Sequence, residues 1–250
     1  MQRFQGFLYD LDGVVIDSEF ARDGVSRELI ASHGGVYDRD KLKPLMSGKP
    51  EREIMQIILD EYKIKASIDE LLAIKREKVK TIYRDSVKFV PGFMDFYRRL
   101  NKKFNLPTAI ATSLDSDYFK LVDKRLGISD LFDGHVYNSG MVKNSKPAPE
   151  VFIYAAEKIG ARADRCVVFE DAPNGIAAAL RAGAETIGLA RTFSKEILLQ
   201  SSSMIIERDL AEGEKLRLKE IIENNPKFIV SKECEYFEMI KPYLLPFLTR

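Results

Sequence analysis

The sequence has few cysteines and histidines, and neither residue type forms a recognisable cluster. Cys166 and Cys234 cannot build a disulfide framework or a cysteine-rich zinc site. Cys166 opens an apolar run, so we expect it to pack as a small buried residue. His33 and His135 lie outside every motif found below and suggest neither a zinc site nor a nucleophile with its base. A disulfide-rich fold and a zinc site built from clustered cysteines or histidines are therefore excluded.

Net charge and long apolar runs are also lacking. The 39 lysines and arginines nearly balance the 38 acidic residues, leaving a net charge of +1, so no overall basic field is available to bind a nucleic acid. No stretch approaches the roughly 18 consecutive apolar residues that a membrane span needs. The first residues lack a secretory apolar region before Asp10. We therefore expect a cytoplasmic protein without a nucleic-acid or membrane partner.

The apolar residues that are present occur in short runs. With 45% hydrophobic and 31% charged residues, the 250-residue chain has the composition of a globular protein. Strand-like runs alternate with amphipathic segments, which predicts a parallel sheet with helices on both faces. The expected strands are 4–9, 106–111, 166–169 and 184–189, and the expected helices are 115–126, 149–159 and 176–182. We expect an α/β fold with a Rossmann-like core.

Residues 18–88 interrupt this alternation. They contain no buried-strand run and instead show helical periodicity, which predicts an all-helical insertion between the first strand and the rest of the core. The core would then comprise residues 1–17 and 89–250, with a C-terminal extension from about residue 211. In the tail, the pattern is compatible with strands at 204–206 and 227–230 and with helices at 212–223 and 236–245.

Polar side chains follow three of the expected strands. In open parallel sheets, ligands bind beyond the carboxyl ends of the strands. Four carboxylates gathered there would repel one another unless a cation neutralised them, and oxygen ligands suit Mg²⁺. A lysine and hydroxyl groups could then bind anionic oxygens, which describes a phosphoryl-transfer site. The residues are Asp10, Asp12, Thr112, Ser113, Lys146, Glu170 and Asp171.

In their order along the chain, these residues resemble the four motifs of the haloacid dehalogenase superfamily. The motifs are Asp10-Leu11-Asp12-Gly13-Val14, Thr112 after an apolar strand, Lys146-Pro147 and Glu170-Asp171. The sequences of the longer segments 12–19, 146–150 and 169–175 are similar to those of the β-phosphoglucomutase-like phosphatases, a subgroup whose members carry a helical cap. The resemblance covers about residues 4 to 210 and implies that the helical insertion is a mobile cap over the site.

The resemblance also implies a role for each motif residue. Asp10 would be the nucleophile that forms an aspartyl-phosphate, and Asp12 would be the general acid and then the general base. Thr112 and Lys146 would hold the transferring phosphoryl oxygens, and Lys146 would keep Asp10 anionic. These four residues are the expected catalytic set.

For the metal, the resemblance implies Mg²⁺ held by the two acidic motifs. Asp171 would bind directly, Glu170 through water or Lys146, and Asp12 through its backbone carbonyl, with Asp10 completing the set. The loop 46–52 resembles the substrate-specificity loop of the family. The expected substrate contacts are Ser113, Arg22, Lys49 and Arg52.

Several activities fit this family. The mutase branch has a histidine where this chain has Arg22, which favours hydrolysis, and the dehalogenase branch lacks the acidic residue found here at Asp12. Phosphonate hydrolases use a cap lysine, and Lys49, Lys75 and Lys78 leave that possibility open. We predict an Mg²⁺-dependent phosphatase of a small phosphomonoester, a phosphosugar or polyol phosphate, in a monomer or weak homo-oligomer. The alternatives are a phosphosugar mutase and a non-catalytic binding protein, whose motif would normally have lost Asp10 or Asp12.

Overall fold

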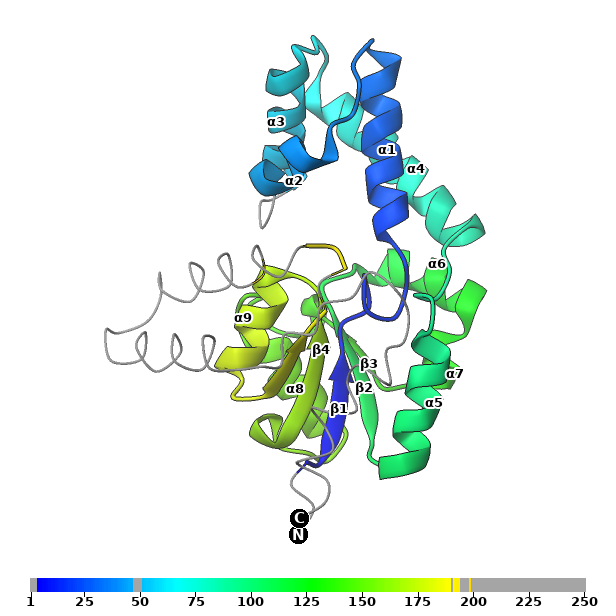
Figure 1. Ribbon diagram of the computed structural model, residues 1–250, viewed down its shortest axis with the longest axis vertical. Coiled ribbons are helices and arrows are strands. Elements are labelled where there is room, and N and C mark those ends of the chain that lie inside the picture. The colour runs from blue at the N-terminus through cyan, green and yellow to red at the C-terminus, as the bar shows by residue number, and fades with distance from the viewer. Residues whose placement is uncertain (1–3, 47–50, 190, 194–197, 199–250) are drawn as a thin grey trace, which may run out of the picture.

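A computed structural model describes residues 4–46, 51–189, 191–193 and 198 of the chain. Within these residues, five strands form one sheet in the order β3-β2-β1-β4-β5, and each neighbouring pair is parallel. The strands are β1 (Gly6–Tyr9), β2 (Thr108–Thr112), β3 (Val136–Asn138), β4 (Cys166–Glu170) and β5 (Glu185–Gly188). The predicted α/β, Rossmann-like core is confirmed, and its first strand lies at the centre of the sheet (Figure 1).

Helices cover both faces of the sheet. Side chains of neighbouring strand residues point to opposite faces, so Phe7 and Tyr9 pack on one side and Leu8 on the other. The first side is covered by α5 (Phe93–Phe104), α6 (Ser116–Leu126) and α7 (Ile128–Leu131), and the second by α8 (Glu150–Lys158) and α9 (Pro173–Arg181). The sheet is therefore the middle layer of three.

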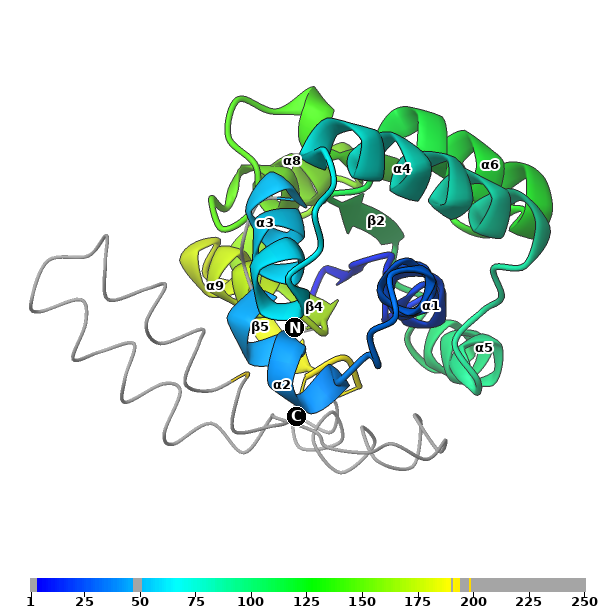
Figure 2. The same ribbon diagram turned by 90° about the horizontal axis from the view of Figure 1, so that it is seen from above.

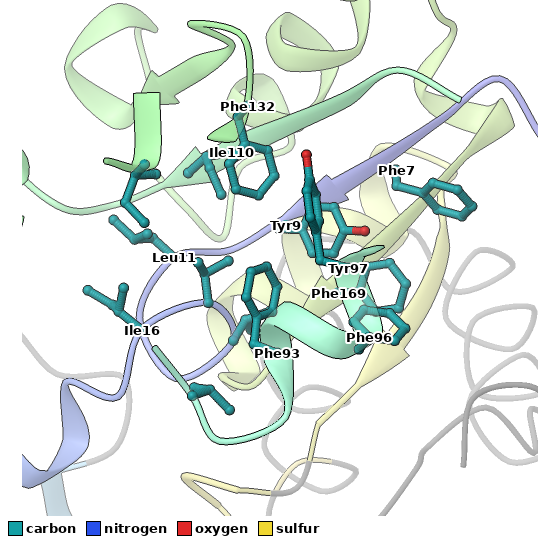
Figure 3. Packing of buried hydrophobic residues seen from close by; sticks show 14 of the residues in the cluster. Phe7, Tyr9, Leu11, Ile16, Phe93, Phe96, Tyr97, Ile110, Phe132 and Phe169 are labelled. Atoms are coloured by element: carbon teal, nitrogen blue, oxygen red, sulfur yellow. The ribbon is translucent and has the colours of Figure 1, made fainter. Parts of the chain in front are cut away.

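The two faces differ in the residues that fill them. On the first face Tyr9 lies among aromatic rings, stacked on Phe169 with 4.8 Å between centroids and edge-on to Phe93 and Phe132 (Figure 3). The second face is filled largely by alanines of β2, α8 and α9, together with Cys166. Burial raises the pKa of the Cys166 thiol to about 12, and the residue packs in the core as predicted.

The predicted helices are confirmed with small shifts at their ends. The Asp115 side chain accepts a hydrogen bond from the backbone N–H of Asp117 and caps α6, and Gly127 ends that helix at φ +65°. The helix α9 begins at Pro173, three residues before the predicted start, because proline is tolerated in the first helical turn, where its missing N–H is not needed. The edge strand β3 was not predicted, since it has three residues and only Asn138 is fully buried.

The described residues of the interrupting segment, 18–46 and 51–88, form four helices above the carboxyl edge of the sheet (Figure 1). They are α1 (Glu19–Ser32), α2 (Arg39–Met46), α3 (Glu51–Tyr62) and α4 (Ile68–Asp85), and we call them the cap. The cap has its own apolar cluster, formed by side chains such as Ile30, Met55, Ile58 and Leu72. In addition, α4 runs beside α6 of the core (Figure 2).

The two chain segments that connect the core to the cap are hydrogen-bonded to each other. The Asp17 N–H donates to the Lys88 carbonyl, and the Val90 N–H donates to the Val15 carbonyl, both at 2.9 Å. This pairing supports our proposal that the cap domain spans residues 18–88. The expected tail elements at 204–206, 212–223, 227–230 and 236–245 lie outside the described residues, as does Cys234. Among the described helices, none combines the length and apolar character required to cross a bilayer.

Candidate active site

Two neighbouring strands, β1 and β4, bring the acidic motifs together at the carboxyl edge of the sheet. Tyr9, the last residue of β1, is in register with Ile110 of β2 and Phe169 of β4. Asp10 therefore follows β1 directly beside Glu170, which ends β4. Asp171 is the next residue, and these three carboxyl groups are buried. We call Asp10, Lys146, Glu170 and Asp171 the acidic floor.

Lys146 links two of the carboxylates of the floor. Its Nζ donates to Asp10 Oδ1 at 2.6 Å, to Glu170 Oε1 at 2.9 Å and to the Ala111 carbonyl at 2.9 Å. An ammonium group has three N–H donors, so every donor of Lys146 is engaged. The side chain is only 4% exposed, and Nζ lies 4.6 Å from the centre of the Phe152 ring. The lysine is therefore held in one position at the ends of β1, β2 and β4.

Two glycines, one in the turn after β1 and one in the first turn of α9, let the backbone come close to the carboxylates. A Cβ on Gly175 would lie 1.5 Å from Glu170 Oε1, and one on Gly13, at φ +79°, would lie 1.8 Å from Asp171 Oδ2. Either distance is a steric clash, so these positions need glycine. Glu170 Oε2 also accepts the N–H groups of Asp171 and Ala172, at 2.7 and 2.8 Å. The carboxylate of Glu170 is thus fixed through both oxygens.

Burial and mutual repulsion dominate the electrostatics of the floor. Burial raises the pKa of Asp10 to about 7, although Lys146 acts in the opposite direction. Burial, followed by the charges of Glu170 and Asp10, raises the pKa of Asp171 well above its ordinary value. Burial alone would lower the pKa of Lys146, but Asp10 and Glu170 outweigh it and raise the pKa. Lys146 alone therefore does not suffice to keep all three carboxyl groups ionised.

The same carboxylates fit a divalent cation. Asp10, Glu170 and Asp171 each offer an oxygen, and these oxygens lie within 4.8 Å of one another. An all-oxygen set with uncompensated negative charge suits Mg²⁺. The Thr192 hydroxyl donates to Asp171 Oδ2 and orients that carboxylate. The Asp12 side chain is not part of this group, and the role of its backbone carbonyl in metal binding stays a prediction.

The hydroxyl residues lie at the end of β2. Thr112 is buried, and its Oγ1 accepts a hydrogen bond from the Leu114 N–H at 3.0 Å. Ser113 is exposed and, like Thr112, lines a cavity of about 650 Å³ that also contains the acidic floor and Asp12. The structure thus brings the predicted catalytic residues and Ser113 to one cavity.

Cap side chains form the opposite wall of this cavity. Lys75 of α4 is paired with Glu51 of α3, with 3.4 Å between Nζ and Oε1, and Asp23 and Ser26 come from α1. Glu51, Asp23 and Ser26 were not among the predicted site residues. Helical spacing places Asp23 and Ser26 on one face of α1, but which face of α1 or α3 turns to the cavity depends on the packing of residues such as Met55.

The predicted cap contacts are a different set. Arg52 does not line the cavity: its side chain is 62% exposed, and Nη1 contacts Asp69 Oδ1 at 2.5 Å. The reason is its place on α3, one residue and therefore about 100° around the helix from Glu51. Lys49 lies outside the described residues. Arg22 belongs to α1, but its side chain is outside what the structure describes.

Comparisons with known proteins agree with this architecture. The family model for haloacid dehalogenase-like hydrolases matches residues 4–183. The fructose-1-phosphate phosphatase YqaB of Escherichia coli is 31% identical over 186 residues, which are 74% of this chain and 96% of that protein. A phosphorylated carbohydrates phosphatase of Thermotoga maritima is 31% identical over 183 residues, 73% of this chain and 83% of its own length.

A solved structure extends the likeness to the whole fold. A haloacid dehalogenase-like protein of Agrobacterium tumefaciens superposes with a TM-score of 0.74 at 20% identity, covering 99% of this chain and 100% of its own. The fold, the motif order and the match over residues 4–183 agree. The chain belongs to the haloacid dehalogenase-like hydrolase family.

Proposed function

We propose that the protein is an Mg²⁺-dependent phosphatase that hydrolyses a small phosphomonoester through a phosphorylated Asp10. The observation that carries the proposal is the acidic floor, in which Lys146 holds Asp10 and Glu170 while Asp171 lies within reach of both. The named activities of the two relatives, on fructose 1-phosphate and on phosphorylated carbohydrates, favour a phosphosugar or polyol phosphate as the substrate.

Asp10 acts first. Its carboxylate attacks phosphorus, a bond forms between an Asp10 oxygen and phosphorus, and the bond from phosphorus to the ester oxygen breaks. Lys146 favours the ionised form of Asp10. Thr112 lines the same cavity, where its hydroxyl can bind a phosphoryl oxygen, whereas Lys146 would first have to release one of its three acceptors. Asp10, Glu170 and Asp171 would hold the Mg²⁺, which when bound offsets the negative charge of the carboxylates and of the phosphate.

Asp12 moves the proton. It gives a proton to the departing ester oxygen, which leaves as an alcohol, and then takes a proton from the water that attacks the aspartyl-phosphate. The second step breaks the bond between phosphorus and Asp10 and releases inorganic phosphate. Asp12 lines the same cavity as Asp10, so one carboxyl group can serve both steps.

The cap wall supports a hydroxyl-rich leaving group. Ser26 and the Glu51–Lys75 pair face the cavity with both hydrogen-bond donors and acceptors, which match the hydroxyl groups of a sugar or polyol. The cavity volume, about 650 Å³, lies in the range typical of small-molecule sites.

The decisive experiment compares wild-type protein with Asp10→Asn on a panel of phosphomonoesters, with and without Mg²⁺. We expect Mg²⁺-dependent phosphate release that falls by a factor of about 10⁴ in the variant, since the nucleophile is lost. Asp117→Asn, an exposed carboxyl on α6, is the matched control and should keep wild-type activity. Equal activity of Asp10→Asn and wild type would refute the mechanism. An isomeric phosphosugar without phosphate release would indicate a mutase, and no turnover at all would favour a binding protein.

A further inference from the structure

A tyrosine of the cap contacts the proposed general acid. The hydroxyl of Tyr83, on α4, donates a hydrogen bond to Asp12 Oδ1 at 3.0 Å, although the two residues are 71 positions apart. We propose that Tyr83 is a positioning residue that orients the Asp12 carboxyl group for proton transfer to the leaving group. This inference rests on the proposed function, because it assigns a partner to the acid and base of that mechanism.

Tyr83 is held firmly enough to serve this purpose. The residue is 1% exposed, and its ring packs edge-on against Tyr118 of α6, with 5.7 Å between centroids. It belongs to the same apolar cluster as Val90 and Phe93 of the core, whereas Leu72, nearer the start of α4, belongs to the cluster of the cap. The end of α4 that carries Tyr83 is therefore anchored on the core.

Asp12, by contrast, lies on a turn beyond the end of β1. The next residue, Gly13, has φ +79°, and its N–H donates to the Ile16 carbonyl at 2.8 Å. This turn places the backbone of Asp12, but the torsions of its side chain must be set by other contacts. The Tyr83 hydroxyl supplies such a contact from a rigid ring.

The contact also selects an oxygen. A carboxyl group has two oxygens, and a general acid must present its proton on the one that faces the leaving group. Because Oδ1 accepts the hydrogen of the Tyr83 hydroxyl, the proton to be transferred is directed to Oδ2. Loss of the hydroxyl should therefore impair protonation of the leaving group while Asp10 still attacks phosphorus.

Kinetics on two phosphate esters distinguish the loss of leaving-group protonation from a general disturbance of the active site. The leaving oxygen of an alkyl ester such as fructose 1-phosphate must be protonated as the bond to phosphorus breaks. The leaving group of p-nitrophenyl phosphate departs as the p-nitrophenolate anion and does not need a proton. In Tyr83→Phe, we expect kcat/KM for the alkyl ester to fall about tenfold, a part of what general acid catalysis contributes, and kcat/KM for the aryl ester to change by less than about twofold. The pH profile of the alkyl reaction should change, and that of the aryl reaction should not.

Tyr97→Phe is the matched control. Tyr97 is also a buried tyrosine, and its hydroxyl donates to the Leu131 carbonyl at 2.8 Å, away from the cavity. Removing the Tyr97 hydroxyl should lower thermal stability as Tyr83→Phe does, but kcat/KM for both esters should stay at the wild-type value. In a double-mutant cycle, adding Tyr83→Phe to Asp12→Asn should change the alkyl reaction by less than about twofold, because the residue through which Tyr83 acts is already altered.

Other results would overturn the assignment. Equal losses on both esters would mean that Tyr83 acts only on the structure, and no loss on either would mean that the hydrogen bond is without effect. A full additional loss in the Asp12→Asn background would show that Tyr83 does not act through Asp12. Each of these outcomes leaves the proposed function intact, because that function fails only if wild type releases no phosphate or Asp10→Asn remains fully active.

Discussion

The acidic floor and the cap wall face the same cavity but are built differently. On the floor, Lys146 and Glu170 have side chains that are 4% and 2% exposed and only 2.9 Å apart. On the wall, Glu51 is 42% exposed and lies 3.4 Å from Lys75. Short buried ion pairs fix atoms to the accuracy that bond formation requires, whereas a longer, wetter pair can exchange partners. The rigid floor suits a phosphoryl-transfer reaction that is the same for every substrate. The less rigid cap wall suits the binding of different leaving groups.

The largest effect should come from breaking the floor. Lys146→Met leaves two buried carboxylates without their shared cation. We expect kcat to fall about 100- to 1000-fold, as when a donor to a reacting anion is removed. The free energy of unfolding should fall by about 3 kcal/mol at about pH 8, and by less at about pH 5, where the carboxyl groups can take up protons.

Steady-state kinetics and urea denaturation measure both effects of Lys146→Met. Lys120→Met, on a lysine that is 73% exposed and paired with Asp117, is the matched control and should be close to wild type in both measurements. If the two lysine variants behaved alike, the floor would not be the tightly linked part of the site.

A smaller effect should come from titrating the floor. The folded-state pKa of Asp10, about 7, lies above its ordinary value of 3.8. The folded protein therefore holds this proton more tightly than the unfolded chain, so the contribution of Asp10 to metal-free stability is greatest below about pH 4 and falls as the pH rises towards 7. Mg²⁺ binds ionised carboxylates, so we expect Mg²⁺ to stabilise the folded protein more strongly as the pH increases.

Thermal melts test this expectation. With Mg²⁺ against chelator, we expect Tm to rise by about 3–5 °C at about pH 8 and to change little at about pH 5. Asp171→Asn should abolish the rise, and the exposed Asp117→Asn should keep it. A rise of equal size at both pH values, or one that survives Asp171→Asn, would contradict the proposed metal site.

The floor was the more predictable region because its residues follow strands. Asp10 and Glu170 each end a short apolar run, and the carboxyl ends of parallel strands meet at one edge whatever the length of chain between them. Lys146 is 136 residues from Asp10, yet its motif could be recognised locally. Strand β3 escaped prediction because it is an edge strand of three residues, of which only Asn138 is buried.

The cap was less predictable because helix rotation depends on packing. Arg52 and Glu51 are neighbours in a loop-like motif, and only the burial of Met55, Ile58 and Leu59 decides which of the two faces the cavity. Tyr83 had no local signal at all, since its hydroxyl meets Asp12 only once α4 has packed on α6. Contacts of this kind are set by tertiary structure rather than by short sequence patterns.

The smallest effect should come from altering the wall. Lys75→Met removes a cation that lines the cavity and leaves Glu51 facing the substrate, so we expect KM for a phosphosugar to rise about fivefold with kcat nearly unchanged, the signature of lost uniform binding. Arg52→Ala removes an exposed cation from the same region of the cap, and KM should change by less than about twofold. Steady-state kinetics on one phosphosugar compares the two variants directly. A large fall in kcat with Lys75→Met would place this lysine among the groups that act on the phosphate, and the contrast between a fixed floor and an adjustable wall would then be wrong.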